Sequence, residues 1–232
     1  TRTFADMAHQ LGLNLPSRTA LGRDAFFVAP SNAMAMAMID GWRGWAGGKL
    51  ALTGPQGSGK THLTHVWADL SGARIISAAD LLEADIPALA RGPLAVEDVH
   101  LIAGNAEAQT GLFHLHNLVL AEGQALLLTG TGPVAHWGLT LPDLVSRMRG
   151  ATMVEMEAPD DALLSALLVK LLADRQLTPK PELINYLMTR MDRSFAAAIA
   201  LVDRLDAASL AQKRPLTRAL AAQVLDIAPP RA

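Results

Sequence analysis

Residues 54–61, GPQGSGKT, match the pattern G-x-x-x-x-G-K-[ST] at every position. In such a glycine-rich loop, the backbone N–H groups and the start of the following helix cradle phosphate oxygens. The lysine, Lys60, reaches the β and γ phosphates of a nucleotide, and Thr61 offers its hydroxyl to Mg²⁺. We therefore expect ADP or ATP with Mg²⁺ as the cofactor of this loop. Its expected cofactor-binding residues are Gly54, Pro55, Gln56, Gly57, Ser58, Gly59, Lys60 and Thr61.

The stretch LAVEDVH at 94–100 offers the acidic partner of this loop. A phosphate loop needs a carboxylate on a neighbouring strand, where it positions Mg²⁺ and a water molecule. Glu97 and Asp98 follow a short apolar run, so they fall at the carboxyl end of a strand, where open α/β sheets bind ligands. We expect Glu97 to contact Mg²⁺ together with Thr61, and Asp98 to be catalytic. An ordinary strand that ends in solvated acids is the alternative.

Two further stretches carry polar residues that suit the same chemistry. LLLTGTG at 126–132 places Thr129 and Thr131 at the end of an apolar run, where Thr131 is a candidate to sense the γ phosphate or orient water. LPDLVSRMRG at 141–150 carries Arg147 and Arg149, for which a solvated position on a helix is the default. An arginine offered to the γ phosphate of a neighbouring molecule can raise the hydrolysis rate about 10³-fold or more.

The elements that must position these residues follow from short apolar runs flanked by Gly or Pro, which predict buried strands. Helical patterns lie between them, as at 60–70 and 108–121, and this alternation predicts a parallel sheet covered on both faces. The stretch AMAMAMIDGW at 33–42 alternates like a strand, but Met and Ala favour helix, and we predict a helix there. The predicted strands are 49–53, 73–77, 93–99, 125–130 and 151–156.

After Pro159 the apolar residues recur at helical spacing only, which predicts a small all-helical domain over 158–232. Asp160, Ser194 and Thr217 are each placed to cap the start of a helix, and Pro181 suits a first helical turn. The sequence therefore divides into an α/β part followed by an all-helical part.

Composition excludes several classes of protein. Half of the 232 residues are hydrophobic and 18% are charged, which excludes a disordered chain. The formal net charge of −2 argues against a protein that grips DNA phosphates by itself. The absence of cysteine excludes disulfides and thiolate metal sites. We find no apolar stretch of membrane-span length and no signal-peptide pattern, and we expect a cytoplasmic protein without membrane contact.

Together these residues resemble the AAA+ ATPases, and among them the DnaA clade. GPQGSGKTHL resembles the Walker A motif of the clade, LLLTGTG occupies the sensor 1 position, and VSRMRG resembles box VII, which makes Arg147 the arginine finger. The resemblance covers residues 20–226 and implies an α/β fold: a P-loop AAA+ module with a parallel five-stranded sheet flanked by helices, followed by a small all-helical lid. We expect a nucleotide-binding base at 21–157 and the lid at 158–232.

The resemblance also places the adenine pocket and reveals two departures from the clade. FFVAPSN at 26–32 lies where the family holds adenine, which implies Phe27, Val28 and Asn32 as pocket residues. Glu97-Asp98 replaces Asp-Asp, so Mg²⁺ positioning shifts and hydrolysis by the chain itself is expected to be weak or absent. The family's sensor 2 arginine falls at Ala196, and Arg193, one turn earlier, is the candidate replacement at the nucleotide.

The N-terminal stretch HQLGLNLP at 9–16 resembles the peptide with which DnaA-related regulators bind the DNA polymerase sliding clamp. In an extended segment its alternate leucines point one way, into an apolar groove, while the glutamine fixes the register. Leucines that pack on the protein itself are the alternative. The resemblance implies a clamp-binding tail over 1–20 and a negative regulator of replication initiation that stimulates ATP hydrolysis by DnaA through Arg147. The expected clamp contacts are Gln10, Leu11, Leu13 and Leu15.

Three other functions remain open from the sequence. A DnaC-like helicase loader or another stand-alone AAA+ ATPase would turn over ATP without DnaA, and a nucleotide kinase would transfer phosphate to a small acceptor. A pure adaptor with a vestigial site would bind no nucleotide. Because the resemblance ends with the lid, we expect no direct sequence-specific DNA binding. The sequence leaves a monomer and a homodimer both open.

Overall fold

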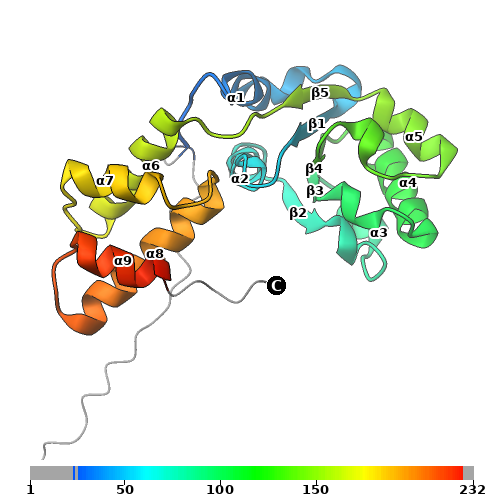
Figure 1. Cartoon of the computed structure of the whole chain (residues 1–232). Helices are drawn as coiled ribbons and strands as arrows, with labels where there is room; N and C mark the ends of the chain where they lie inside the picture. Colours follow the sequence, from blue (N-terminus) through cyan, green and yellow to red (C-terminus); the bar gives the residue numbers. More distant parts are fainter. Residues whose placement is uncertain (1–22, 24–25, 227–232) are drawn as a thin grey trace, which may run out of the picture.

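The computed structural model describes residue 23 and residues 26–226. Within these residues lies a five-stranded parallel sheet with the strand order β2-β3-β4-β1-β5 (Figure 1). Its strands occupy the five predicted stretches, so the predicted parallel sheet is confirmed. The strands are β1 (Lys49–Gly54), β2 (Arg74–Ser77), β3 (Leu94–Glu97), β4 (Leu126–Thr131) and β5 (Thr152–Glu155).

The expectation that the acidic strand neighbours the strand before the phosphate loop is wrong. Strand β4 lies between β1 and β3 and pairs with both, so β3 is one strand further away. β4 pairs along the whole length of β1, from Lys49 opposite Leu126 to Gly54 opposite Thr131. The order of strands in a parallel sheet depends on these long-range pairings rather than on order along the chain.

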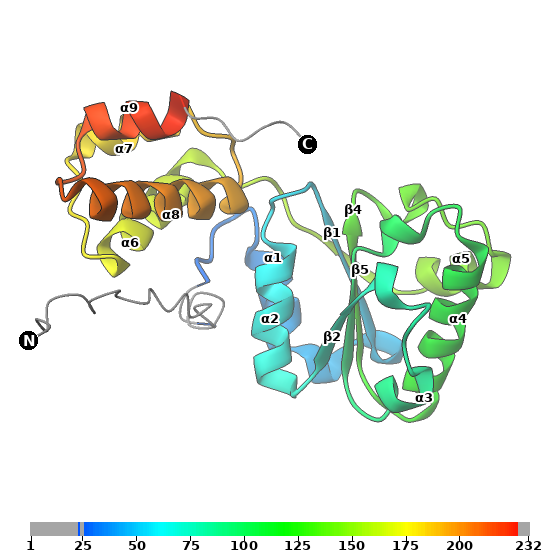
Figure 2. The same ribbon diagram turned by 90° about the horizontal axis from the view of Figure 1, so that it is seen from below.

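Helices cover both faces of the sheet, as its apolar strands require. Figure 2 shows α1 (Ala33–Asp40) and α2 (Lys60–Ser71) on one face, with α3 (Ile86–Leu89), α4 (Ala106–Ala121) and α5 (Pro142–Arg149) on the other. The helix predicted over 33–42 is confirmed up to Asp40. Short 3₁₀ helices are η3 (Trp42–Gly44), η4 (Ala46–Gly48), η5 (Ala78–Asp80), η6 (Val99–Ile102) and η7 (Val134–His136).

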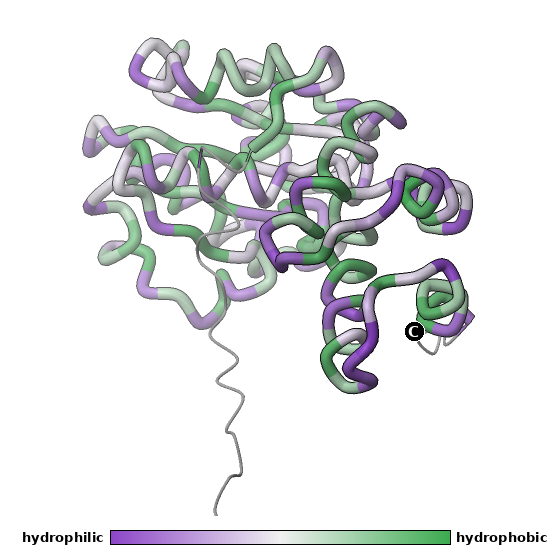
Figure 3. The backbone as a smooth tube through the Cα atoms, turned by 90° about the vertical axis from the view of Figure 1, so that its left-hand side faces the viewer, coloured by the Kyte–Doolittle hydropathy of each residue, from purple (hydrophilic) through white to green (hydrophobic). Residues whose placement is uncertain are grey.

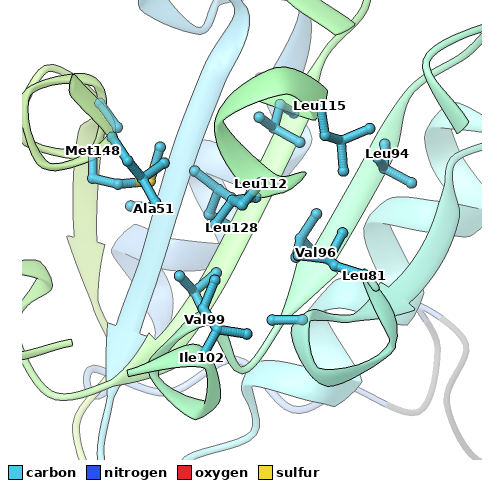
Figure 4. Packing of buried hydrophobic residues seen from close by; sticks show 14 of the residues in the cluster. Ala51, Leu81, Leu94, Val96, Val99, Ile102, Leu112, Leu115, Leu128 and Met148 are labelled. Carbon is cyan, nitrogen blue, oxygen red and sulfur yellow. The ribbon is translucent and has the colours of Figure 1, made fainter. Parts of the chain in front are cut away.

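Each face of the sheet buries its own apolar cluster. Between the sheet and α4, Leu112 and Leu115 lie beside Leu128, Leu94 and Val96 of the strands (Figure 4). In the same cluster, Met148 of α5 lies beside Ala51 of β1. The opposite face packs α1 and α2 around Leu50, Leu52 and Trp67. The phosphate loop and α5 are therefore both anchored to β1.

The lid consists of α6 (Asp161–Asp174), α7 (Pro181–Met188), α8 (Phe195–Gln212) and α9 (Arg218–Asp226). The predicted caps are confirmed, because the Asp160 carboxylate and the Ser194 and Thr217 hydroxyls each accept a first-turn N–H. Apolar and polar segments alternate along these helices (Figure 3), and the apolar side chains form a separate core. None of the helices in the described residues is long and apolar enough to cross a membrane.

The base is formed by β1–β5 and α1–α5. Two segments lie between it and the lid: the one that follows β5 and the one that precedes α1. The Glu157 N–H, beyond β5, donates to the Ser31 carbonyl at 3.0 Å. In the segment that contains Ser31, Phe26 packs in the cluster of α1 and α2, whereas the next residue, Phe27, packs against the lid core. These neighbouring aromatic residues therefore connect the core of the base with the core of the lid.

At the amino end of β1, Lys49 and His116 form a buried polar pair. The Lys49 Nζ lies 3.1 Å from the His116 Nε2 and donates to the Arg147 carbonyl at 2.8 Å. Burial lowers the pKa of His116 to about 4, with the Lys49 and Arg147 charges acting in the same direction and the Asn117 side chain opposing them. The imidazole is therefore neutral at pH 7.

This pair makes stability depend on pH. Unfolded His116 titrates near its ordinary pKa of about 6.5, so acid protonates the unfolded chain first and destabilises the fold. Between pH 7 and pH 5 we expect this residue alone to lower the free energy of unfolding by about 2 kcal/mol. Urea unfolding at both pH values, compared with His116→Gln, isolates the effect. An equal pH dependence in both proteins would contradict the assignment.

Candidate nucleotide site

The predicted phosphate loop connects the carboxyl end of β1 to the first turn of α2. Strand β1 ends at Gly54, and α2 begins at Lys60 after Gly59, whose φ of 97° places it in the left-handed region. The loop N–H groups and the start of α2 thereby lie together at the carboxyl edge of the sheet. This arrangement suits phosphate, because an α-helix N-terminus favours anions. Within the loop, Gln56 is exposed and Ser58 is buried.

Lys60 is held at the loop by the loop's own backbone. Its Nζ donates to the Gly54 carbonyl at 3.0 Å and to the Pro55 carbonyl at 2.8 Å. Burial lowers the pKa of Lys60, while the nearby charges of Asp98 and Glu97 oppose that shift. A largely buried ammonium with two carbonyl acceptors is placed to bind a phosphate oxygen.

Glu97 is the carboxylate that fits a cation at this site. Burial raises the pKa of Glu97 and Asp98 adds to the rise, while a side-chain hydrogen bond with Thr61 opposes it. The Glu97 Oε1 and the Ser58 Oγ are buried without a hydrogen-bond partner. Mg²⁺ binds through one or two carboxylates together with substrate phosphates. The buried, unpartnered oxygen of Glu97 and its contact with Thr61 therefore fit the expected pair of Mg²⁺ ligands.

Asp98 and the end of β4 form a connected network beside the loop. Asp98 adopts a left-handed φ of 57°, and its N–H donates to the Thr129 Oγ1 at 3.1 Å. The Thr131 N–H donates to the His100 Nδ1 at 3.3 Å. The Gly132 N–H donates to the Gly54 carbonyl at 3.2 Å, which ties this strand end to the phosphate loop. Asp98 and Thr131 therefore lie at the same edge as Lys60, whereas the part of His100 was not predicted.

The lid reaches the phosphate loop directly through the start of α8. The Phe195 N–H donates to the Gly57 carbonyl at 3.2 Å. Gly57 has a φ of 76°, and a Cβ there would lie less than 3.0 Å from the Ser194 Cβ. The Phe195 ring lies 3.2 Å from where a Cβ of Gly59 would be. The sequence indicates Ser194 as a helix cap, but it carries no signal for this contact between distant segments.

The expected adenine pocket occupies the connection between base and lid. Asn32 is buried, accepts the Ala29 N–H at 2.8 Å and donates to the Phe27 carbonyl at 2.8 Å. Phe27 packs against the lid core, and Val28 is exposed. Asn32 thus fixes the backbone of this segment, while Val28 presents an apolar surface to solvent.

The remaining predicted residues are Arg193, Arg147 and those of the tail. The Arg193 Nη1 forms an ion pair with the Asp161 Oδ1 at 3.0 Å, so its guanidinium is held at the start of α6. Arg147 is exposed on α5, and its carbonyl binds Lys49 at the opposite end of β1 from Gly54. The tail residues Gln10, Leu11, Leu13 and Leu15 lie outside the described residues.

The first prediction from this geometry concerns Lys60. A hydrogen bond to a charged group contributes about 1.5–3 kcal/mol, so we expect Lys60→Ala to weaken binding of Mg²⁺-ADP about 10- to 100-fold. Titration calorimetry measures the affinity. The control is Lys170→Ala, which removes an exposed lysine of the lid paired with Asp174. Equal affinity of the Lys60 variant and the control would contradict a phosphate-binding role.

The second prediction concerns the contact between Gly57 and Ser194. Gly57→Ala adds a Cβ that cannot fit beside Ser194, so we expect faster amide hydrogen exchange in the first turn of α8. Gly72→Ala is the matched control, because Gly72 has a similar φ of 72° but no atom within 4 Å of a new Cβ. Both changes add backbone strain, of about 1–2 kcal/mol, but only the first disturbs the lid. The same exchange pattern in both variants would contradict the contact.

Comparisons with known proteins agree with this architecture. Residues 160–225 match the family model described as "Hda, lid domain". An uncharacterized protein of Haemophilus influenzae is 29% identical over 189 residues, which cover 75% of this chain and 80% of that protein. The family match therefore falls on the lid, whereas the similarity to the Haemophilus protein extends over most of each chain.

Solved structures of DnaA share the fold. Domain III of DnaA from Thermotoga maritima superposes with a TM-score of 0.79 at 19% identity, covering 89% of this chain and 96% of that one. AMPPCP-bound DnaA from Aquifex aeolicus gives a TM-score of 0.68 at 19% identity over 79% of this chain. This chain spans 64% of the Aquifex structure. Residues 160–225 are therefore similar to the Hda lid domain, and the chain shares the fold of DnaA domain III.

Proposed function

We propose that this protein is a nucleotide-dependent negative regulator of DNA replication initiation that stimulates ATP hydrolysis by DnaA. The observation that carries the proposal is the match of the lid to the Hda lid domain, on a chain whose phosphate loop is complete. The similarity to DnaA supports a partner of the same fold, because AAA+-type sites can be completed by a residue from a neighbouring molecule.

The nucleotide site belongs to both base and lid in this proposal. ADP or ATP binds with its phosphates at the loop and Lys60, and with its adenine beside Phe27, Val28 and Asn32. Thr61 and Glu97 hold Mg²⁺, which when bound neutralises phosphate charge, and Asp98 and Thr131 face the terminal phosphate. Because the start of α8 already contacts Gly57 and Gly59, nucleotide bound there contacts lid and base together.

Hydrolysis by the chain itself is proposed to be weak or absent. Ala196 stands where the family has its sensor 2 arginine, and Arg193, the candidate replacement, is paired with Asp161. Glu97 carries a raised pKa, so its charged form is disfavoured until a cation binds. These features favour a protein that holds nucleotide over one that turns it over rapidly.

Arg147 is proposed to act in trans, on ATP held by DnaA. Five residue steps along β1 lead from Lys49, which binds the Arg147 carbonyl, to Gly54, and a strand rises about 3.3 Å per residue. The two ends of β1 therefore lie about 16 Å apart. Arg147 is exposed at the end remote from the loop, which supports a partner's nucleotide as its target.

The tail over 1–20, the base over 21–157 and the lid over 158–232 are proposed as the three functional segments. Binding of the tail to the sliding clamp would hold the protein near DnaA on replicated DNA and raise its effective concentration there. The clamp motif, Gln10 with Leu11, Leu13 and Leu15, supports this part of the proposal through its sequence alone.

Arg147→Ala is expected to abolish stimulation of DnaA. Removal of an arginine finger costs about 10³-fold or more in rate, so stimulated hydrolysis of ATP by DnaA should fall to its unstimulated rate. The assay contains DnaA, ATP and DNA-loaded clamp. Arg149→Ala, which changes another exposed arginine of the same helix, is the matched control and should stimulate normally. Full stimulation by the Arg147 variant would contradict the proposed finger.

Replacement of Gln10, Leu11, Leu13 and Leu15 by Ala is expected to remove clamp binding. Surface plasmon resonance with immobilised clamp should show at least about a tenfold weaker affinity, because each buried leucine contributes about 1.5–3 kcal/mol. Mg²⁺-ADP binding, measured in parallel, should stay unchanged. Wild-type clamp affinity in this variant would contradict the tail assignment. Rapid ATP turnover by the wild-type chain without DnaA would instead favour a stand-alone ATPase.

A further inference from the structure

The last turn of α5 rests on one buried lysine from the sheet. The Lys49 Nζ donates to the Arg147 carbonyl at 2.8 Å and lies 3.1 Å from the His116 Nε2. Lys49 and His116 are both buried, and they come from β1 and α4. Three elements of the base therefore meet at a single ammonium group.

The end of α5 offers carbonyl groups that such a donor can bind. The last four carbonyl groups of an α-helix lack partners within the helix, and a cation there also interacts favourably with the helix dipole. The Gly150 N–H reaches the Ser146 carbonyl at 3.2 Å, and the Ala151 N–H reaches the Met148 carbonyl at 3.1 Å. Lys49 supplies the hydrogen bond for the carbonyl of Arg147, which lies between those two residues.

His116 holds the ammonium from the other side. Its Nδ1 lies 3.2 Å from the Asn117 Oδ1, which can only accept, so the proton is on Nδ1 and the Nε2 accepts from Lys49. Among the described residues, Lys49 forms no ion pair with a carboxylate. A buried ammonium without a carboxylate is costly, and here its partners are a neutral imidazole and a helix carbonyl.

Apolar contacts and the hydrogen bond from Lys49 both act on the last turn of α5. Leu144 and Met148 are fully buried, and Met148 lies beside Ala51 of β1 (Figure 4). These side chains seat the helix on the sheet. Arg147 precedes Met148 and is exposed, and the path of its backbone affects where its guanidinium is carried.

We propose that Lys49, supported by His116, is a positioning residue for Arg147. By fixing the Arg147 carbonyl, Lys49 sets the direction in which the guanidinium leaves the helix end toward a nucleotide on a partner. This inference rests on the proposed function, in which Arg147 acts on ATP held by DnaA. The local part of it, the capping of α5 by Lys49, is independent of any partner.

Lys49→Met tests both parts, because methionine fills similar space but donates no hydrogen bond. We expect faster amide hydrogen exchange over residues 146–151, with the exchange of β4 unchanged. In the DnaA assay, the maximal stimulated rate should fall about tenfold, as for the loss of about 1.4 kcal/mol. The concentration of protein that gives half-maximal stimulation should not change. Lys170→Met, on the lid, is the matched control and should behave as wild type.

His116→Leu is the second variant, and it keeps the hydrogen bond between Lys49 and Arg147 while it removes the other partner of Lys49. We expect a smaller change in the same direction in both measurements, and His116→Gln, which keeps an acceptor, should restore wild-type behaviour. This series stays informative if Lys49→Met folds poorly. Wild-type exchange over 146–151 in both Lys49→Met and His116→Leu would overturn the capping by Lys49.

The activity results separate this inference from the proposed function. Arg147→Ala without stimulation, together with Lys49→Met at the full maximal rate, would overturn the positioning role and leave the finger intact. Full stimulation by Arg147→Ala would overturn the proposed function, and with it any effect of Lys49 on catalysis through Arg147. Hydrogen exchange would still show whether Lys49 caps α5. A fall in stimulation that merely follows the folded fraction, measured by thermal unfolding, would also overturn positioning.

Discussion

Close approach at the phosphate loop is the constraint on which the rest of the structure depends. Two other segments come so near to this loop that a side chain would not fit at the glycines that face them. The Met156 carbonyl, just after β5, lies against Gly54, and Ser194, at the start of α8, lies against Gly57. The loop must stay open to phosphate on one side while it is packed on the other. Glycine meets both demands, and this packing connects the lid to the base.

The two ends of β1 serve two different tasks. Lys60 and Glu97 lie near its carboxyl end, and burial disfavours the charged form of each. A phosphate would stabilise the charged Lys60, and a cation would stabilise the charged Glu97. At its amino end, Lys49 holds the carbonyl of Arg147. One strand thus connects the proposed nucleotide site with the helix that carries the exposed Arg147.

Much of this fold is predictable from local signals, because apolar runs, turn residues and caps act within a few residues of one another. The strand order is not, since β4 pairs with β1 through contacts between residues far apart in sequence. The phosphate loop is recognised from its own residues. Its contact with Ser194 and the bond between Lys49 and Arg147 join distant segments, and neither residue type signals such a partner by itself.

The most direct test of the shared site is amide hydrogen exchange of the wild-type chain with and without Mg²⁺-ADP. If base and lid hold the nucleotide together, exchange should slow in the phosphate loop at 54–61 and in the first turn of α8 at 195–198 over the same range of ADP concentration. Protection confined to the loop, with the start of α8 unchanged at saturating ADP, would contradict the account.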